Sequence, residues 1–226
     1  MLKSFMLMQW KVSRWAVAIL LPICFATPIL VARFGQRTSA GEFSEPALDF
    51  LRGTTIWLPF FPVLAAITGL TFALTAWTWD HNTNHVYALS LPIERWRYSL
   101  MKMISGAAFM LVPVAALLVG ALVAMATVKL PAGLHAYPLS FTVRFMFGAL
   151  ILYAIIFAMA SGTVKTTLRI IIGIVLFFVL GSFVTDMLSD MLNTPIPSPI
   201  GIFFEALMEW PGPFNVFGGS WMLFDV

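Results

Sequence analysis

The sequence predicts an all-α polytopic membrane protein. Sixty per cent of its 226 residues are hydrophobic and ten per cent are charged, whereas soluble domains average roughly 45–50% and 25%. The apolar residues fall in five long blocks, each long enough for a helix that needs about 20 residues to cross a bilayer. Backbone polar groups find no water in lipid, so each block should be helical.

The five predicted transmembrane helices belong to a single transmembrane domain over residues 1–226. They cover residues 15–32, 54–79, 103–128, 145–162 and 170–187. The first block follows several cations, as a signal peptide would, but it is too long for the apolar core of one, so we expect a retained span. Cys24 is the only cysteine, which excludes a disulfide or a cysteine-based metal site within one chain.

The distribution of Lys and Arg predicts a cytoplasmic N-terminus. One set of span flanks, which includes the N-terminus and the 80–102 segment, holds eight of these cations, and the opposite set holds five. The cations are scattered at span ends instead of clustered, so the net charge of +3 gives no support for nucleic-acid binding.

Residues 1–14 have two interpretations, which the sequence leaves open. Lys3, Lys11 and Arg14 fall within an arc of about 80° on a helix, as in a cytoplasmic interfacial helix. The same cations also fit the positively charged cytoplasmic flank of the first span.

The segment 189–226 is predicted to lie on the outer side of the membrane, and it contains no Lys or Arg. Within it the apolar run from Ile200 to Trp210 is too short to span a bilayer at 1.5 Å per residue. Prolines stand on both sides of the run. We therefore expect a short outer interfacial helix near the C-terminus.

The segment from Asp80 to Lys102 is polar but has helix-forming residues on both sides of Pro92. Pro92 followed by Glu94 is typical of the first turn of a helix. We expect that helix to continue into the third span. A short cytoplasmic helix joined to a span in this way can act as a lever.

This segment resembles the membrane subunits of type-2 ATP-binding-cassette (ABC) exporters. The similar features are Asp80 just past the second span, the run Leu89-Ser90-Leu91-Pro92-Ile93-Glu94-Arg95, and Lys102 with Gly106 at the start of the third span. The opening Gln9-Trp10-Lys11-Val12-Ser13-Arg14 is similar to the family's cytoplasmic lead-in. The specific part covers some 25 residues.

The resemblance implies that residues 80–102 form a coupling helix that seats in a cleft of an ATP-hydrolysing subunit. It also implies a dimeric permease, with a second identical or related membrane subunit, that exports a substrate across a bacterial cytoplasmic membrane. ATP and Mg would bind to the partner subunit, and this chain would bind no cofactor. The residues expected to contact the partner are Asp80, His85, Tyr87, Leu89, Leu91, Pro92, Glu94, Arg95 and Arg97.

The sequence departs from the family pattern in two ways. His85 stands near a position where the family often has glycine, and the sixth span that the family places after the outer helix is not present in this sequence. An alternative function is a non-transporting membrane scaffold or sensor whose 80–102 loop docks a cytoplasmic partner, which need not be an ATPase.

We find no sequence pattern typical of an enzyme active site or of a metal site. The run Gly162-Thr163-Val164-Lys165-Thr166 lacks the first glycine and the preceding strand of a phosphate-binding loop. His81 and His85 have the spacing of a metal-binding pair, with Asp80 as an open third ligand, but we interpret them as polar loop residues. The deep interiors of the predicted spans lack Asp, Glu, Lys, Arg and His, which argues against an ion-coupled carrier or an intramembrane hydrolase.

Two further patterns keep two interpretations each. Ala116, Gly120 and Ala124 repeat a small residue every four positions along the third span, which allows close approach of a helix from the same chain or from a second copy. Asp186 and Asp190 lie at the outer end of the fifth span, where solvation at the interface and a role at the mouth of a pathway are both compatible with their position.

Overall fold

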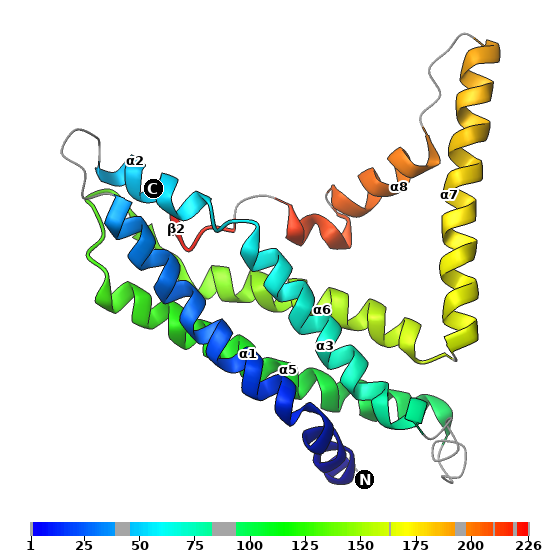
Figure 1. The fold of residues 1–226 in the computed structure, drawn as a ribbon, viewed down its shortest axis with the longest axis horizontal. Coiled ribbons are helices and arrows are strands. Elements are labelled where there is room, and N and C mark those ends of the chain that lie inside the picture. The colour runs from blue at the N-terminus through cyan, green and yellow to red at the C-terminus, as the bar shows by residue number, and fades with distance from the viewer. Residues whose placement is uncertain are drawn as a thin grey trace. The chain divides into compact units, whose positions relative to one another are not determined.

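The computed structural model describes residues 2–38, 46–82, 94–162, 164–192, 198–209, 211–218 and 221–225. Most of them are helical (Figure 1). Among these described residues, five helical segments are long and apolar enough to cross a membrane. The predicted class of an all-α membrane protein with five spans is confirmed at that level.

The chain forms two compact units. The first comprises Met1–Phe157 together with Ser220–Val226, and the second comprises Ala158–Gly219. The expectation of a single transmembrane domain stays a prediction.

The first unit is built around helix α1 (Leu2–Thr38) packed along helix α5 (Arg95–Thr127). Figure 1 shows these two helices side by side. Residues 2–14 continue into the first span within α1 and do not form a separate helix. A continuous helix is compatible with both interpretations, so an interfacial location for residues 1–14 stays a prediction.

The second predicted span, residues 54–79, is not one continuous helix. Helix α2 (Pro46–Thr55) ends before a turn, and helix α3 (Phe60–Asn82) begins after it. Pro59 explains the break, because its ring would clash with the carbonyl group four residues earlier in a continued helix. Proline is tolerated next to a helix start, where a backbone N–H would have no helical partner.

Helix α6 (Pro138–Ala160) packs against α3 at a close contact. A Cβ atom added to Gly69 of α3 would lie 2.9 Å from the backbone nitrogen of Tyr153 in α6, so glycine allows the backbones to approach. The rings of Phe61 and Phe141 extend this contact, with centroids 4.7 Å apart. The helix begins seven residues before the predicted start, because Pro138 is a favourable first helical residue.

The chain returns to the first unit near its C-terminus. Strand β2 (Phe224–Asp225) pairs antiparallel with strand β1 (His135–Ala136), which lies between α5 and α6. Phe224 is buried, and its ring meets that of Phe50 in α2 edge to face, with centroids 5.1 Å apart. These contacts anchor the end of the 189–226 segment, which the sequence did not predict.

The second unit contains helix α7 (Val164–Leu192), helix α8 (Pro199–Met208) and the 3-10 helix η1 (Pro213–Phe217). The short helix predicted at residues 200–210 is confirmed by α8, although its place on the outer side stays a prediction. The Ser198 hydroxyl accepts a hydrogen bond from the Gly201 N–H at 3.0 Å and caps α8. Asp186 and Asp190 are exposed on α7.

Candidate functional site

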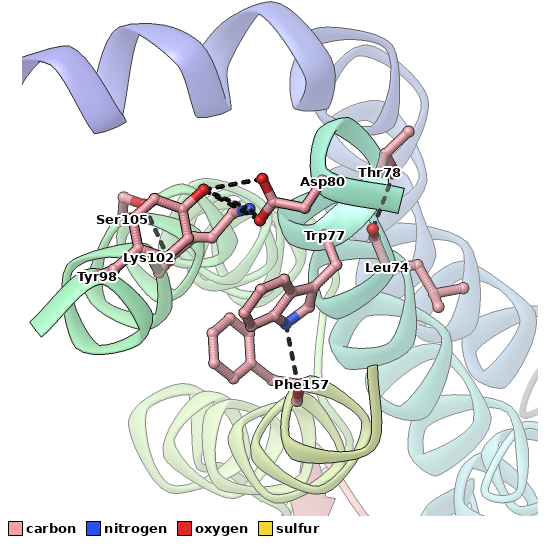
Figure 2. Close-up of polar contacts among 8 residues, drawn as sticks. All are labelled: Leu74, Trp77, Thr78, Asp80, Tyr98, Lys102, Ser105 and Phe157. Carbon is pink, nitrogen blue, oxygen red and sulfur yellow. Dashed lines mark hydrogen bonds and ion pairs between the residues drawn. The ribbon is translucent and has the colours of Figure 1, made fainter. Parts of the chain in front are cut away.

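Three helix ends meet at one end of the first unit: the beginning of α1, the end of α3 and the beginning of α5. The last two carry the two ends of segment 83–93, which lies outside the described residues. Side chains from α3 and α5 form a buried polar cluster at this point, made of Asp80, Tyr98 and Lys102 (Figure 2). We call it the charge cluster.

The charge cluster centres on the carboxylate of Asp80, whose side chain has no exposed surface. The Tyr98 hydroxyl group donates to this carboxylate and lies 2.8 Å from Oδ1 and 3.0 Å from Oδ2. The Lys102 ammonium group forms an ion pair with Oδ2 and lies 3.4 Å from the Tyr98 Oη. Each polar group of the cluster therefore has a partner from the facing helix.

Aromatic rings surround the Lys102 ammonium group. Its Nζ lies 4.5 Å from the ring centroid of Trp77 and 5.2 Å from that of Tyr98. A cation over an aromatic face is stabilised by the ring quadrupole, by about 2 kcal/mol or more where water is excluded. Lys102 is only 3% exposed, so these rings replace part of the hydration that the ammonium group loses.

The surrounding helices hold the charge cluster in place. The Trp77 indole N–H donates to the carbonyl oxygen of Phe157 at 3.1 Å, which connects α3 to α6. The Phe5 ring of α1 covers the Tyr98 ring edge to face at 5.3 Å. All four long helices of the first unit thus contact the cluster or its nearest neighbours.

Burial of the charged groups of Asp80 and Lys102 destabilises the protein unless all of their interaction partners are present. Moving two charges out of water carries a penalty that their attraction offsets only with good geometry and further hydrogen bonds. Removing one partner of such a pair typically costs about 3–5 kcal/mol, because an uncompensated buried charge is left. The charge cluster therefore fixes α3 to α5 where the chain leaves and re-enters the bundle.

The structure divides the predicted partner-binding residues into three groups. Asp80 faces inward in the charge cluster, so its carboxylate is not on the surface; its expected contact with a partner is replaced by a contact within the chain. Glu94, Arg95 and Arg97 are exposed at the beginning of α5, and Glu94 pairs with Arg97 at 2.9 Å. The residues His85, Tyr87, Leu89, Leu91 and Pro92 lie outside the described residues.

The small residues of α5 contact the same chain. Gly120 and Ala124 are buried, and Ala116 is half-buried. A Cβ atom on Gly120 would lie 3.0 Å from the backbone carbonyl carbon of Phe25 in α1. The close approach at Gly120 is thus internal packing between α1 and α5.

Sequence reasoning did not find the pairing within the charge cluster. The family resemblance includes Asp80 and Lys102 without pairing them, the cation distribution also counts Lys102, and no sequence pattern marks Tyr98. One signal was present: two consecutive spans joined by a short loop must bring the loop's ends together. Opposite charges at those ends, Asp80 and Lys102, then have reason to pair.

The described side chains bring together no three His, Cys, Asp or Glu residues in positions that could hold a metal ion. Comparisons with protein-family models, with curated proteins and with solved structures find no match for this chain.

Proposed function

We propose that this chain is the membrane-spanning permease subunit of an ABC exporter. In this proposal ATP and Mg bind to a separate nucleotide-binding subunit, and a second membrane subunit, identical or related, completes the transport path. The chain itself carries out no chemistry. The support is the resemblance over residues 80–102 together with the structure at the two ends of that segment.

The observation that carries the proposal is the charge cluster at the base of the 83–93 segment. A coupling element must transmit force, so its ends need firm attachment to the helices that move. Asp80 precedes the segment and Tyr98 and Lys102 follow it, and their buried contacts join α3 to α5. A push on the segment would therefore move both helices together.

Exposed residues next to the cluster offer a surface for a cytoplasmic partner. Glu94, Arg95, Trp96 and Arg97 are all exposed, and the Arg97 guanidinium lies 5.3 Å from the Trp96 ring centroid. Arginine and aromatic residues are enriched at protein interfaces. Charges at the rim of such an interface would set its register and association rate.

The exposed apolar helix α7 fits a place in the membrane. Within the second unit, the most apolar stretch of Leu168–Met191 is not buried. In the proposed assembly this surface contacts lipid or the second membrane subunit.

A pull-down from detergent tests this function. Tagged wild type is compared with a variant that carries Leu89→Ala, Leu91→Ala and Arg95→Ala, and the co-purified material is assayed for ATPase activity. Lys129→Gln serves as the control, because Lys129 is exposed at the opposite end of α5. The proposal expects ATPase activity with wild type and control, and its loss with the triple variant. Absence of ATPase activity from all three samples would favour the membrane scaffold or sensor instead.

A further inference from the structure

A groove lies between the beginning of α1 and the end of α3, on the surface of the first unit. Its volume is about 500 Å³, within the range of about 300–1,000 Å³ for small-molecule sites. Most of the lining comes from one face of α1, where residues three and four apart are neighbours. The lining residues are Ser4, Leu7, Met8, Lys11, Val12 and Trp79.

The groove is mostly apolar and has one cationic side chain. Leu7 is 58% and Trp79 48% exposed, and Met8 and Val12 are half-buried. The cation is Lys11, which forms no ion pair with any acidic residue of the described chain. An occupant should therefore combine a long apolar part with an anionic group.

The groove lies where the chain would meet the membrane surface. It is at the end of the span Ser4–Arg37 and of the span Pro46–Asn82. Lysine and tryptophan at span ends are typical of the level of the lipid headgroups, where a lysine keeps its stem in lipid and its ammonium group in water. Basic pockets between transmembrane helices at this level bind anionic lipid headgroups.

We propose that this groove binds one anionic phospholipid of the adjacent leaflet. The Lys11 ammonium group pairs with the lipid phosphate, and the Ser4 hydroxyl group, two helical turns away on the same face, lies along the same groove. An acyl chain packs on Leu7, Met8 and Trp79. Met8, Val12 and Trp79 also line a small cavity that reaches Lys102, so the lipid would support the outer wall of the charge cluster. Lipid binding in this groove requires neither an ATPase nor transport.

The test uses the purified protein in nanodiscs of neutral phosphatidylcholine, with pyrene-labelled phosphatidylglycerol added and energy transfer from tryptophan measured. Wild type should bind phosphatidylglycerol in preference to labelled phosphatidylcholine. Lys11→Gln should weaken phosphatidylglycerol binding about fivefold, the effect of one lysine near an anionic membrane surface. Arg14→Gln is the matched control, because Arg14 is also exposed on α1 but does not line the groove.

A second variant and a competitor complete the test. Leu7→Asp places an anion in the groove at an exposed position and should abolish the preference without loss of helix content. Inorganic phosphate should not displace the labelled lipid, because it lacks the apolar part. Equal weakening by Lys11→Gln and Arg14→Gln would overturn the site in favour of diffuse surface charge. Equal binding of the two lipids by wild type, or displacement by inorganic phosphate, would also overturn it.

Discussion

Among single residues, Asp80 and Lys102 form the buried ion pair whose disruption should cost the most stability. The pair joins two helices at 0% and 4% side-chain exposure. By contrast, the pair between Glu94 and Arg97 is about 60% exposed on both sides, and exposed pairs contribute about 0–1 kcal/mol. We therefore expect substitutions in the two ion pairs to differ widely in their effect on the free energy of unfolding.

Asp80→Ala should destabilise the protein by about 3–5 kcal/mol, because Lys102 is left as a buried charge without its counter-ion. Joint replacement by Asp80→Leu and Lys102→Met should restore most of that loss, since neither charge remains buried. Thermal unfolding in detergent measures both effects, with Glu94→Gln as the control. An Asp80→Ala variant as stable as Glu94→Gln would contradict the described burial.

Gly120 and Gly173 provide a second comparison at this scale. Gly120→Ala should cost about 1–3 kcal/mol, because the new Cβ meets the backbone of Phe25, which cannot move aside easily. Gly173→Ala in α7 should leave stability unchanged or slightly higher, since nothing lies within 4 Å of its added Cβ. Comparing unfolding midpoints of the two variants tests the prediction, and equal midpoints would argue against close packing of α1 on α5.

At the scale of elements, the returning strand β2 closes the first unit. Phe224 is 1% exposed against Phe50, and the Tyr137 N–H donates to the Leu223 carbonyl oxygen at 2.9 Å. Phe224→Ala should cost about 3–5 kcal/mol, as is usual for a large core aromatic residue, and should expose the C-terminal end. Limited proteolysis of a C-terminally tagged protein measures this exposure.

Phe183→Ala in α7 is the control for that experiment, because Phe183 is 67% exposed. Its tag should be released no faster than that of wild type. If Phe224→Ala and Phe183→Ala lost the tag at the same rate, strand β2 would not anchor the chain end.

The sequence was most informative for elements that follow from residue patterns within one continuous segment. Long apolar blocks and helix-stop residues predicted five spans and α8. It was less informative where distant residues meet: the β1–β2 pair joins positions 135 and 225, and no periodicity reports such a contact. Pro59 was a local signal for the break before α3, but the apolar pattern continues through it and conceals the turn.

In the whole molecule, the predicted five-span topology requires α5 to cross the membrane. The helix has 33 residues and is therefore about 50 Å long, more than the hydrocarbon core of about 30 Å. Arg95 is exposed at the first residue of the helix, and Lys129 is exposed just beyond its last residue. These two positions should lie on opposite sides of the bilayer.

Single-cysteine labelling tests this arrangement. A membrane-impermeant maleimide applied to intact cells should label Lys129→Cys, and Arg95→Cys only after the membrane is opened, because the cation distribution predicts a cytoplasmic N-terminus. The native Cys24 is buried and should give little background. Labelling of both positions from the same side would contradict the spanning topology, and labelling of Arg95→Cys alone would reverse its orientation.

The proposed function requires that a partner ATPase bind at the 83–93 segment and that the charge cluster transmit its movement. The most direct measurement has two parts. One is the amount of ATPase that co-purifies with this chain, and the other is the rate of ATP hydrolysis by the complex after reconstitution in lipid. Asp80→Ala should retain the bound ATPase but hydrolyse ATP at the rate of the isolated partner, whereas the joint variant Asp80→Leu and Lys102→Met should keep the regulated rate because apolar packing still joins α3 to α5. An Asp80→Ala complex with the same regulated rate as wild type would contradict transmission through the cluster, and a wild-type complex without ATPase would contradict the proposed function itself.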